Sequence, residues 1–502
     1  MTLFTHPLTL VTLSPLLGVL VIAFLGEQHK KAIRWTALLS SLLTFALSLW
    51  VLAQFDRSVA GLQMEVNQPW LAFGQTAVAF HLGIDGLSLL MLLLTTLLTP
   101  IALLSTWSAV EERVKGFMVF FLLLEVAMVG VFLAQDLVLF FIFWEFTLVP
   151  MYFLIGIWGG ERRIYAAVKF FLFTMAGSML MLLAILYLGL QTGTFSVPDL
   201  VAGRGAFAAA QTWLFLAFAV AFAIKVPMWP LHTWLPDAHV EAPTAGSVIL
   251  AGVLLKMGAY GFLRFNLPLF PQAAVQFAPW MAGLAVIGIL YGAAVSYVQK
   301  DVKKLVAYSS VSHLGFVMLG IFALNPQGVA GGILQMVNHG LSTGALFLIV
   351  GMLYERRHTR DLAAFGGLWK VLPVMGTLAL VVTLSSMGLP GLNGFVGEFT
   401  ILLGAFGSQV LGSAWFAGLA TLGVILAAVY LLHMFERVFL GPVTQTENQR
   451  LAEITPREIV TLAPLLILIL WIGIYPKPFL ALLDPTVTQI VALVQSTAVA
   501  LH

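Results

Sequence analysis

Long apolar stretches constrain the fold of this chain more than any other feature of its sequence. A helix needs roughly 20 largely apolar residues to cross the hydrocarbon core of a membrane, and such stretches recur along all 502 residues. They are continuous rather than alternating, so they indicate helices and not the strands of a β-barrel. We therefore predict an all-α integral membrane protein in which residues 1–502 form a single polytopic membrane domain.

We predict about 14 transmembrane helices from the length that a membrane requires. The seventh contains Lys225-Val226-Pro227, and the twelfth contains Leu389-Pro390-Gly391, so both are predicted to be broken helices. Residues 478–502 are predicted to form a short amphipathic helix on the surface. The predicted helices are 8–26, 34–54, 84–107, 116–134, 137–157, 166–190, 208–231, 243–266, 277–298, 303–323, 328–353, 371–407, 412–435 and 458–475.

The composition excludes most other classes of protein. Apolar residues make up 60% of the chain and charged residues 9%, and the mean hydropathy is +1.00, whereas an ordinary soluble domain has about 25% charged residues. So few charges cannot cover a soluble particle of this size. The net charge of +2 gives no basis for binding nucleic acid. The absence of cysteine excludes disulfides, thiolate metal sites and iron–sulfur clusters from this chain.

The distribution of Lys and Arg predicts the orientation in the membrane. Loops on the cytoplasmic side carry an excess of these residues, and here most of them follow odd-numbered helices. Both termini are therefore predicted to lie outside the cytoplasm. The few basic residues on the opposite side are Arg57, Arg204, Arg264 and Lys477.

Several ionisable residues fall inside predicted membrane helices. Such a group costs about 2.5–3.5 kcal/mol on insertion scales, and it usually faces the interior of a helix bundle or a water path. A lysine near a helix end, such as Lys225, can extend its ammonium group to the interface, but the short stems of Glu145 and Glu398 do not allow this. A single buried histidine is often a packing residue, which is the interpretation we prefer for His433. The remaining ionisable residues in predicted helices are Lys256, Glu125, His313 and His339.

The chemistry that suits this set is proton transfer. Burial favours the neutral form of both Lys and Glu, and a nearby opposite charge favours their charged forms. A buried Lys beside a titratable Glu is therefore able to hold or release a proton as the pair closes or separates. Broken helices support this interpretation, because unpaired backbone groups inside a membrane require a hydrated cavity lined by protein.

The two predicted breaks lie five helices apart, which indicates an internal repeat. Transporters with repeated halves often place broken helices at corresponding positions. We predict two inverted five-helix repeats, helices 4–8 over about 116–266 and helices 9–13 over about 277–435, with helices 7 and 12 broken. This prediction depends on position alone.

Several long segments carry a resemblance to a known family. The sequences at 140–160, 221–265, 300–321, 335–348 and 388–402 resemble the antiporter-like subunits of respiratory complex I, which are related to the subunits of Mrp antiporters. The most specific segment is PLHTWLPDAHVEAPTAGSV, and the resemblance extends over nearly the whole chain. Glu398 stands where the sister subunits L and N and the Mrp subunits typically have Lys, and about 25 residues after the last helix leave no room for the long lateral helix of subunit L.

The resemblance implies roles for individual residues. Glu145 and Lys225 match an ion pair of the fifth and seventh helices, and Lys256 matches a central lysine that passes the proton along. Glu398 matches a terminal residue that faces the exit half-channel. The remaining matches are His313 and His339 on the central polar axis, His232 and Asp136 at the half-channel edges, and Glu125, which matches less clearly.

The resemblance also implies a setting. It implies a non-redox proton-translocating subunit with no cofactor in this chain, while FMN, iron–sulfur clusters and quinone belong to other subunits of the complex. It implies sister antiporter-like subunits L and N as partners, in the inner membrane of a bacterial cell. Two alternatives remain open, a subunit of an Mrp-type sodium/proton antiporter and a membrane subunit of a related hydrogenase or carbon-concentrating complex.

Overall fold

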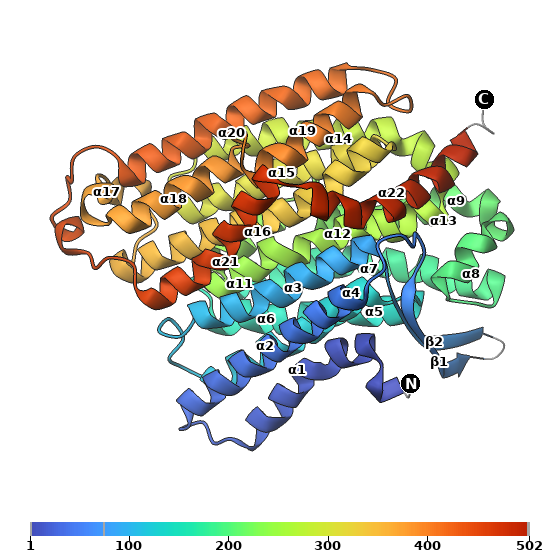
Figure 1. Ribbon diagram of the computed structural model, residues 1–502, viewed down its shortest axis with the longest axis horizontal. Coiled ribbons are helices and arrows are strands. Elements are labelled where there is room, and N and C mark those ends of the chain that lie inside the picture. Colours follow the sequence, from blue (N-terminus) through green and yellow to red (C-terminus); the bar gives the residue numbers. More distant parts are fainter. Residues whose placement is uncertain (1–2, 74–75, 499–502) are drawn as a thin grey trace.

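The computed structural model describes residues 3–73 and 76–498, and it is mostly helical (Figure 1). Within this part of the chain, 14 helical segments are long and apolar enough to cross a membrane. The helices run roughly parallel or antiparallel to one another in one bundle (Figure 1). The long segments are α1 (Pro7–Phe24), α2 (Lys30–Gln54), α3 (Gly86–Ser105), α4 (Val114–Leu133), α5 and α6 (Leu137–Phe146, Leu148–Trp158), α7 (Arg163–Thr192), η2 and α9 (Arg204–Ala210, Gln211–Lys225), the run from α11 to α13 (Thr244–Leu269), α14 (Pro271–Tyr297), α15 (Val302–Phe322), α16 (Pro326–Arg357), α20 (Trp415–Phe439), α21 (Pro456–Ile474) and α22 (Lys477–Ala498).

The two predicted breaks are present. Helix α9 ends at Lys225, residues 226–233 form turns, and the short helix α10 (Trp234–Glu241) follows. Helix α18 (Pro373–Ser386) is separated from α19 (Asn393–Phe406) by a loop in which Gly388 and Gly391 have φ of +79° and +93°. These values favour glycine, because a side chain strains a left-handed backbone. The breaks are therefore confirmed, and the arrangement as two inverted repeats stays a prediction.

Residues 63–84 differ from the prediction of a wholly α-helical chain. They form an antiparallel hairpin of β1 (Gln63–Phe73) and β2 (Thr76–Ile84). Val78, Leu82 and Ile84 of β2 are buried, and the hairpin packs against α1, α3 and α4. We call the end of the bundle that holds β1, β2 and the short helix α8 (Val197–Ala202) the hairpin end (Figure 1), and the opposite end the basic end.

Helix α22 lies across the hairpin end. Thr486 accepts a hydrogen bond from Gly86 N (3.1 Å) at the start of α3, and Gln495 donates to Leu324 O (3.3 Å) in the turn between α15 and α16. One helix that contacts both of these positions runs along the face of the bundle rather than through it. This agrees with the predicted surface helix over its described part, while residues 499–502 of that prediction lie outside the described residues. The composition of α22 also meets the criteria for a membrane span. The start of α1 and the end of α22 both lie at the hairpin end (Figure 1).

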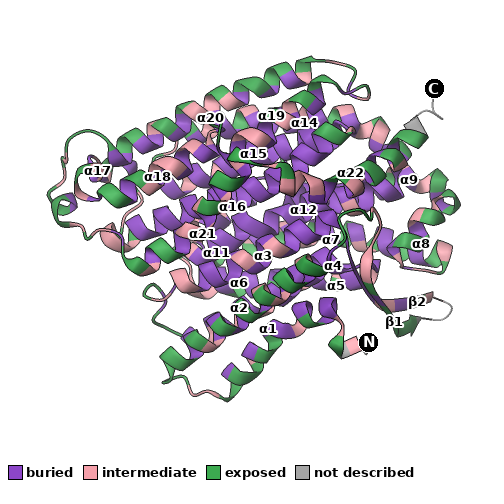
Figure 2. Cartoon of the chain, viewed as in Figure 1, coloured by how far each residue is buried: buried purple, intermediate pink, exposed green. Residues whose placement is uncertain are grey.

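Burial identifies the centre of the bundle. The Thr244–Leu269 run and α16 are wholly buried in their apolar windows, whereas two thirds of the α20 and α21 windows are not buried (Figure 2). A helix buried on all sides has no face toward lipid. Polar groups on these two segments are therefore positioned to act inside the protein.

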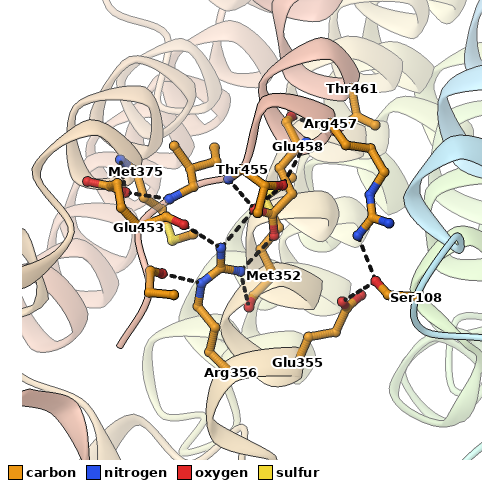
Figure 3. Close-up of polar contacts among 12 residues, drawn as sticks. Ser108, Met352, Glu355, Arg356, Met375, Glu453, Thr455, Arg457, Glu458 and Thr461 are labelled. Atoms are coloured by element: carbon orange, nitrogen blue, oxygen red, sulfur yellow. Dashed lines mark hydrogen bonds and ion pairs between the residues drawn. The ribbon is translucent and has the colours of Figure 1, made fainter. Parts of the chain in front are cut away.

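Ion pairs and helix caps join several helices at the basic end (Figure 3). Arg356 at the end of α16 makes a two-pronged ion pair with Glu458 of α21, with both N–O distances at 2.7 Å. Glu453 accepts hydrogen bonds from Val374 N (2.9 Å) and Met375 N (3.3 Å) at the start of α18. Glu458 also completes a capping box with Thr455. These contacts hold the ends of α16, α18 and α21 together.

Replacing Arg356 with Gln is expected to destabilise the folded protein by about 2 kcal/mol, because it leaves the Glu458 carboxylate largely buried without its cation. The measurement is the midpoint of thermal inactivation of the purified membrane complex. The exposed Arg437 on α20 provides the control variant Arg437→Gln, whose midpoint should not change. Equal midpoints for both variants would contradict the assigned role.

Candidate functional site

A line of buried polar side chains crosses the centre of the bundle. Lys256 Nζ lies 2.6 Å from His339 Nδ1, and the ring centroids of His339 and His313 are 5.9 Å apart. His313 Nδ1 lies 3.0 Å from Glu398 Oε1. All four side chains are at most 3% exposed, and they come from α12 (Leu255–Gly261), α16, α15 and α19. Four of the predicted site residues therefore form one axis.

Local helix geometry positions Lys256 at mid-depth. It lies near the middle of the Thr244–Leu269 run, just after a π-helical segment at Leu250–Leu254. Such segments interrupt the regular backbone hydrogen bonds and recur at functional sites. Here the carbonyl of Ala251 accepts a hydrogen bond from Lys256 Nζ. A Cβ at Gly340 would meet Gly252 O at 3.0 Å, so glycine lets α16 approach closely enough for His339 to reach Lys256.

A polar gap separates the two histidines. A cavity of about 10 Å³ between them is lined by His313, Gln335, Asn338, His339 and Ser342, among others. This is close to the smallest space that one water molecule occupies. His339 Nε2 is buried and has no hydrogen-bond partner in the described structure. One water molecule in this cavity is able to complete the axis between His339 and His313.

Glu398 ends the axis close to the second break. Its Oε1 also accepts a hydrogen bond from Gln335 Nε2 (3.2 Å), and Tyr430 OH lies 3.1 Å from His313 Nε2 on the other side of the ring. The second oxygen, Oε2, is buried and has no hydrogen-bond partner in the described part of the chain. A Cβ at Gly388 would lie 2.9 Å from this oxygen, so the loop of the broken helix passes directly over it. Oε1 of Glu398 is therefore engaged in hydrogen bonds, whereas Oε2 is available to bind a proton.

The predicted pair of Glu145 and Lys225 is not a direct contact. Lys225 Nζ lies 3.4 Å from Thr147 Oγ1 and 5.2 Å from the ring centroid of Trp144. Glu145 Oε1 is buried without a partner, and no ion pair within 4.0 Å joins these two described residues. Glu145 lies near the end of α5, and Lys225 is the last residue of α9, at the first break. The two side chains are therefore not in ionic contact in this structure.

The remaining predicted residues have separate surroundings. His232 lies in the turns after α9, with its ring 5.0 Å from that of Tyr291. Asp136 caps α5 by accepting hydrogen bonds from Val138 N (2.9 Å) and Leu139 N (3.1 Å). Burial raises the pKa of Asp136. Glu125 on α4 is fully buried, and neither oxygen has a partner in the described structure.

Two further buried groups were not predicted as site residues. His239 on α10 is fully buried, stacks on Phe347 at 4.7 Å, and has no hydrogen-bond partner in the described structure for either ring nitrogen. Lys303 donates hydrogen bonds to Ala242 O (2.5 Å) and Val240 O (3.3 Å). Lys303 is one of the basic residues that follow an odd-numbered predicted helix, and only the fold shows that it is buried. His239 lies in the most specific segment of the resemblance, and this position was the one feature of the sequence that could have marked it as a site candidate.

The described residues contain no group of three or more His, Cys, Asp or Glu side chains arranged to hold a metal ion. The axis consists instead of groups that each carry or pass a proton: an ammonium, two imidazoles and a carboxylate. Its geometry suits proton transfer along hydrogen bonds.

Comparisons with known proteins identify the family. The model of the NADH:quinone oxidoreductase/Mrp antiporter transmembrane family matches residues 134–427. The chain belongs to this family.

Two relatives are similar to this chain over nearly its whole length. NADH-quinone oxidoreductase subunit M of Rhodobacter capsulatus is 46% identical over 500 residues, which cover 96% of each chain. NADH-ubiquinone oxidoreductase chain 4 of Arabidopsis thaliana is 44% identical over 480 residues, covering 95% of this chain and 96% of that one. The resemblance stated from the sequence is therefore confirmed.

Solved structures have the same fold. A chain of respiratory complex I from Thermus thermophilus with bound NADH superposes with a TM-score of 0.86 at 33% identity, covering 97% of this chain and 99% of that chain. A chain of the membrane-bound sulfane sulfur reductase, an archaeal respiratory membrane complex, gives a TM-score of 0.85 at 25% identity over 95% and 77%. The fold is thus shared by membrane complexes with different names, so the residues of the site must decide the function.

Proposed function

We propose that this chain is the antiporter-like membrane-arm subunit M of a respiratory complex I, and that it translocates protons without taking part in the redox chemistry. The observation that carries the proposal is the axis from Lys256 through His339 and His313 to Glu398. The similarity to proteins named subunit M supports the assignment to complex I.

Protons move along the axis in a simple scheme. Lys256 holds a proton at mid-depth and gives it to His339 Nδ1, and His339 Nε2 releases a proton to a water molecule in the polar gap. That water passes a proton to His313 Nε2 when this nitrogen exchanges its contact with Tyr430 for the water. His313 then gives a proton to Glu398, whose free oxygen Oε2 lies under the loop of the second break. Lys225 and Glu145 lie apart in this structure, so a closed ion pair between them belongs to a different step of the cycle.

The setting is part of the proposal. We place the chain in the inner membrane of a bacterium, with both termini on the periplasmic side, because most Lys and Arg residues lie at the basic end. The hairpin end then faces the periplasm. The partners are the other membrane-arm subunits, and the sister subunits L and N are the proposed neighbours. FMN, iron–sulfur clusters and quinone belong to other chains of the complex.

Purification of a tagged chain from gently solubilised membranes tests the proposal. We expect a large particle that contains iron–sulfur subunits and reduces quinone with NADH. After reconstitution it should form a pH gradient across the vesicle membrane. A small particle of hydrophobic subunits in which Na⁺ dissipates a pH gradient would contradict it and favour the Mrp-type antiporter. Pumping by the particle is measured with and without Na⁺, which serves as the internal control.

A further inference from the structure

Lys256 lies on the same face of its helix as two other polar residues toward the hairpin end. Tyr260 and Arg264 follow it at intervals of four residues, and such positions lie above one another on a helix. We infer that Arg264, Tyr260 and Asp85 form a barrier that closes the path between Lys256 and the hairpin end to protons. The inference rests on the proposed function, because a barrier is needed only if Lys256 carries protons.

The three side chains are locked together by short contacts. Arg264 Nη2 lies 2.6 Å from Asp85 Oδ1, and Arg264 Nε donates a hydrogen bond to Tyr260 OH (3.1 Å). Tyr260 OH donates a hydrogen bond to Phe132 O (2.9 Å) and lies 3.2 Å from Ser88 Oγ. Asp85 also caps α3 by accepting a hydrogen bond from Ser88 N (3.0 Å). In the described structure the Tyr260 hydroxyl is therefore engaged by Phe132, Ser88 and Arg264 and not by Lys256.

A cavity reaches the barrier from the hairpin end. It has a volume of about 330 Å³, and its lining combines apolar residues with the polar residues Glu65, Asp85, Gln135, Arg264, Thr486 and Gln489. Water and hydronium ions are able to enter a space of this size that holds several polar groups. The cavity meets Asp85 and Arg264, whereas Tyr260 and Lys256 do not line it.

Aromatic rings fill the space behind the ion pair. The Tyr260 ring packs against Phe132 at 5.1 Å and Phe265 at 6.3 Å, and Phe265 packs in turn against Phe140 at 4.4 Å. No hydrogen bond within the described residues joins Tyr260 to Lys256. A proton that passed Arg264 would therefore meet an apolar layer before it reached Lys256.

Arginine suits this position better than any other cation. Its guanidinium does not release its proton in a protein, so Arg264 is unable to relay protons, and it holds the Asp85 carboxylate in an ion pair. Pairing with Asp85 limits the cost of burying the charge. Lys256, eight residues away, carries the opposite property, since a lysine is able to release its proton when buried. The helix thus places a releasable cation at mid-depth and a fixed cation at the hairpin end.

A barrier at this place gives the axis its direction. Protons that leave through Glu398 accumulate on the side that the cavity faces. An open path from that cavity to Lys256 would let them return and dissipate the gradient. The barrier leaves His339 as the only described hydrogen-bond partner of Lys256 that titrates.

Passive proton entry into proteoliposomes that contain the whole complex tests the inference. A potassium diffusion potential drives protons inward in the absence of NADH, and a trapped pH dye reports their entry. We expect Arg264→Gln to let protons enter several-fold faster than the unaltered complex does. The double variant Arg264→Gln with Lys256→Met should return to the original rate, because the leak passes through Lys256. Arg57→Gln, an exposed arginine in the loop between α2 and the hairpin, is the matched control and should not leak.

Three outcomes would overturn the inference. These are an unchanged rate in Arg264→Gln, a leak that persists in the double variant, and a leak in the control of equal size. Arg264→Lys keeps a cation beside Asp85 but makes its proton releasable, and it should leak at an intermediate rate. If Arg264→Gln does not assemble, a leak in Arg264→Lys that is no faster than in the unaltered complex overturns the inference.

Failure of the barrier and failure of the proposed function give different results. The leak assay needs no NADH, so it reports the barrier alone. If Lys256→Met by itself leaves NADH-driven pumping intact, the proposed function is wrong whatever the leak rates are. If that variant stops pumping while Arg264→Gln does not leak, only the barrier is wrong.

Discussion

Replacing Lys256 with Met is expected to reduce NADH-driven proton uptake by the reconstituted complex at least about tenfold, because forcing charge through an apolar gap costs several kcal/mol and each 1.4 kcal/mol is a factor of ten in rate. Methionine keeps most of the volume of the lysine side chain but binds no proton. The contact of 2.6 Å with His339 Nδ1 would be lost, and with it the start of the axis.

Two further substitutions separate charge from proton release at this position. Lys256→Arg keeps a cation but does not release its proton, so it should pump as poorly as Lys256→Met. Lys256→His keeps a titratable group and should recover part of the rate. Lys31, exposed at the start of α2, provides the control Lys31→Met, which should pump normally. Normal pumping by Lys256→Met in a fully assembled complex would show that the axis does not carry protons.

The sequence predicted the features that depend on local composition. Apolar length predicted nearly all the membrane segments, and proline predicted the breaks after Lys225 and around Gly391, because both effects act within a few residues. Buried charge alone marked Lys256 and Glu398 as site candidates, since a charge inside an apolar helix is costly wherever the helix packs. The family resemblance supplied the roles of the histidines.

The features that the sequence left out depend on tertiary packing. Strand pairing at residues 63–84 requires a partner segment and a buried surface, and neither is visible in a short window. The burial of Lys303 depends on the end of α10, whose carbonyls at Val240 and just after it at Ala242 accept its hydrogen bonds. The separation of Glu145 from Lys225 depends on tertiary contacts, since the Lys225 ammonium lies near Thr147 and the Trp144 ring. The sequence identified Arg264 only as one of the few basic residues on the side opposite the cytoplasm. Its position between the cavity and Lys256 is visible only in the folded structure.

The second large effect is expected at the other end of the axis. Replacing Glu398 with Gln keeps the shape of the side chain and its hydrogen bond with Gln335, but removes the ability to bind and release a proton at this site. We expect proton uptake to fall at least about tenfold, because a general acid–base group typically contributes roughly 100-fold or more to a rate. The amount of assembled complex on a native gel should stay close to normal. Glu398→Asp keeps the carboxylate on a shorter stem, so it should recover part of the rate.

A role in packing makes the opposite prediction. If Glu398 serves mainly to hold α19 against α15 and α16, Glu398→Gln should assemble and pump normally, because the amide is able to replace most of its hydrogen bonds. Loss of assembly with normal pumping per assembled particle would also favour packing. Glu436, exposed near the basic end of α20, gives the matched control Glu436→Gln, which should change neither quantity. Because the same carboxylate pairs with His313, a His313→Gln variant should lose pumping to a similar degree, and the double variant should be no worse than either single one, as expected for two groups that act in one path.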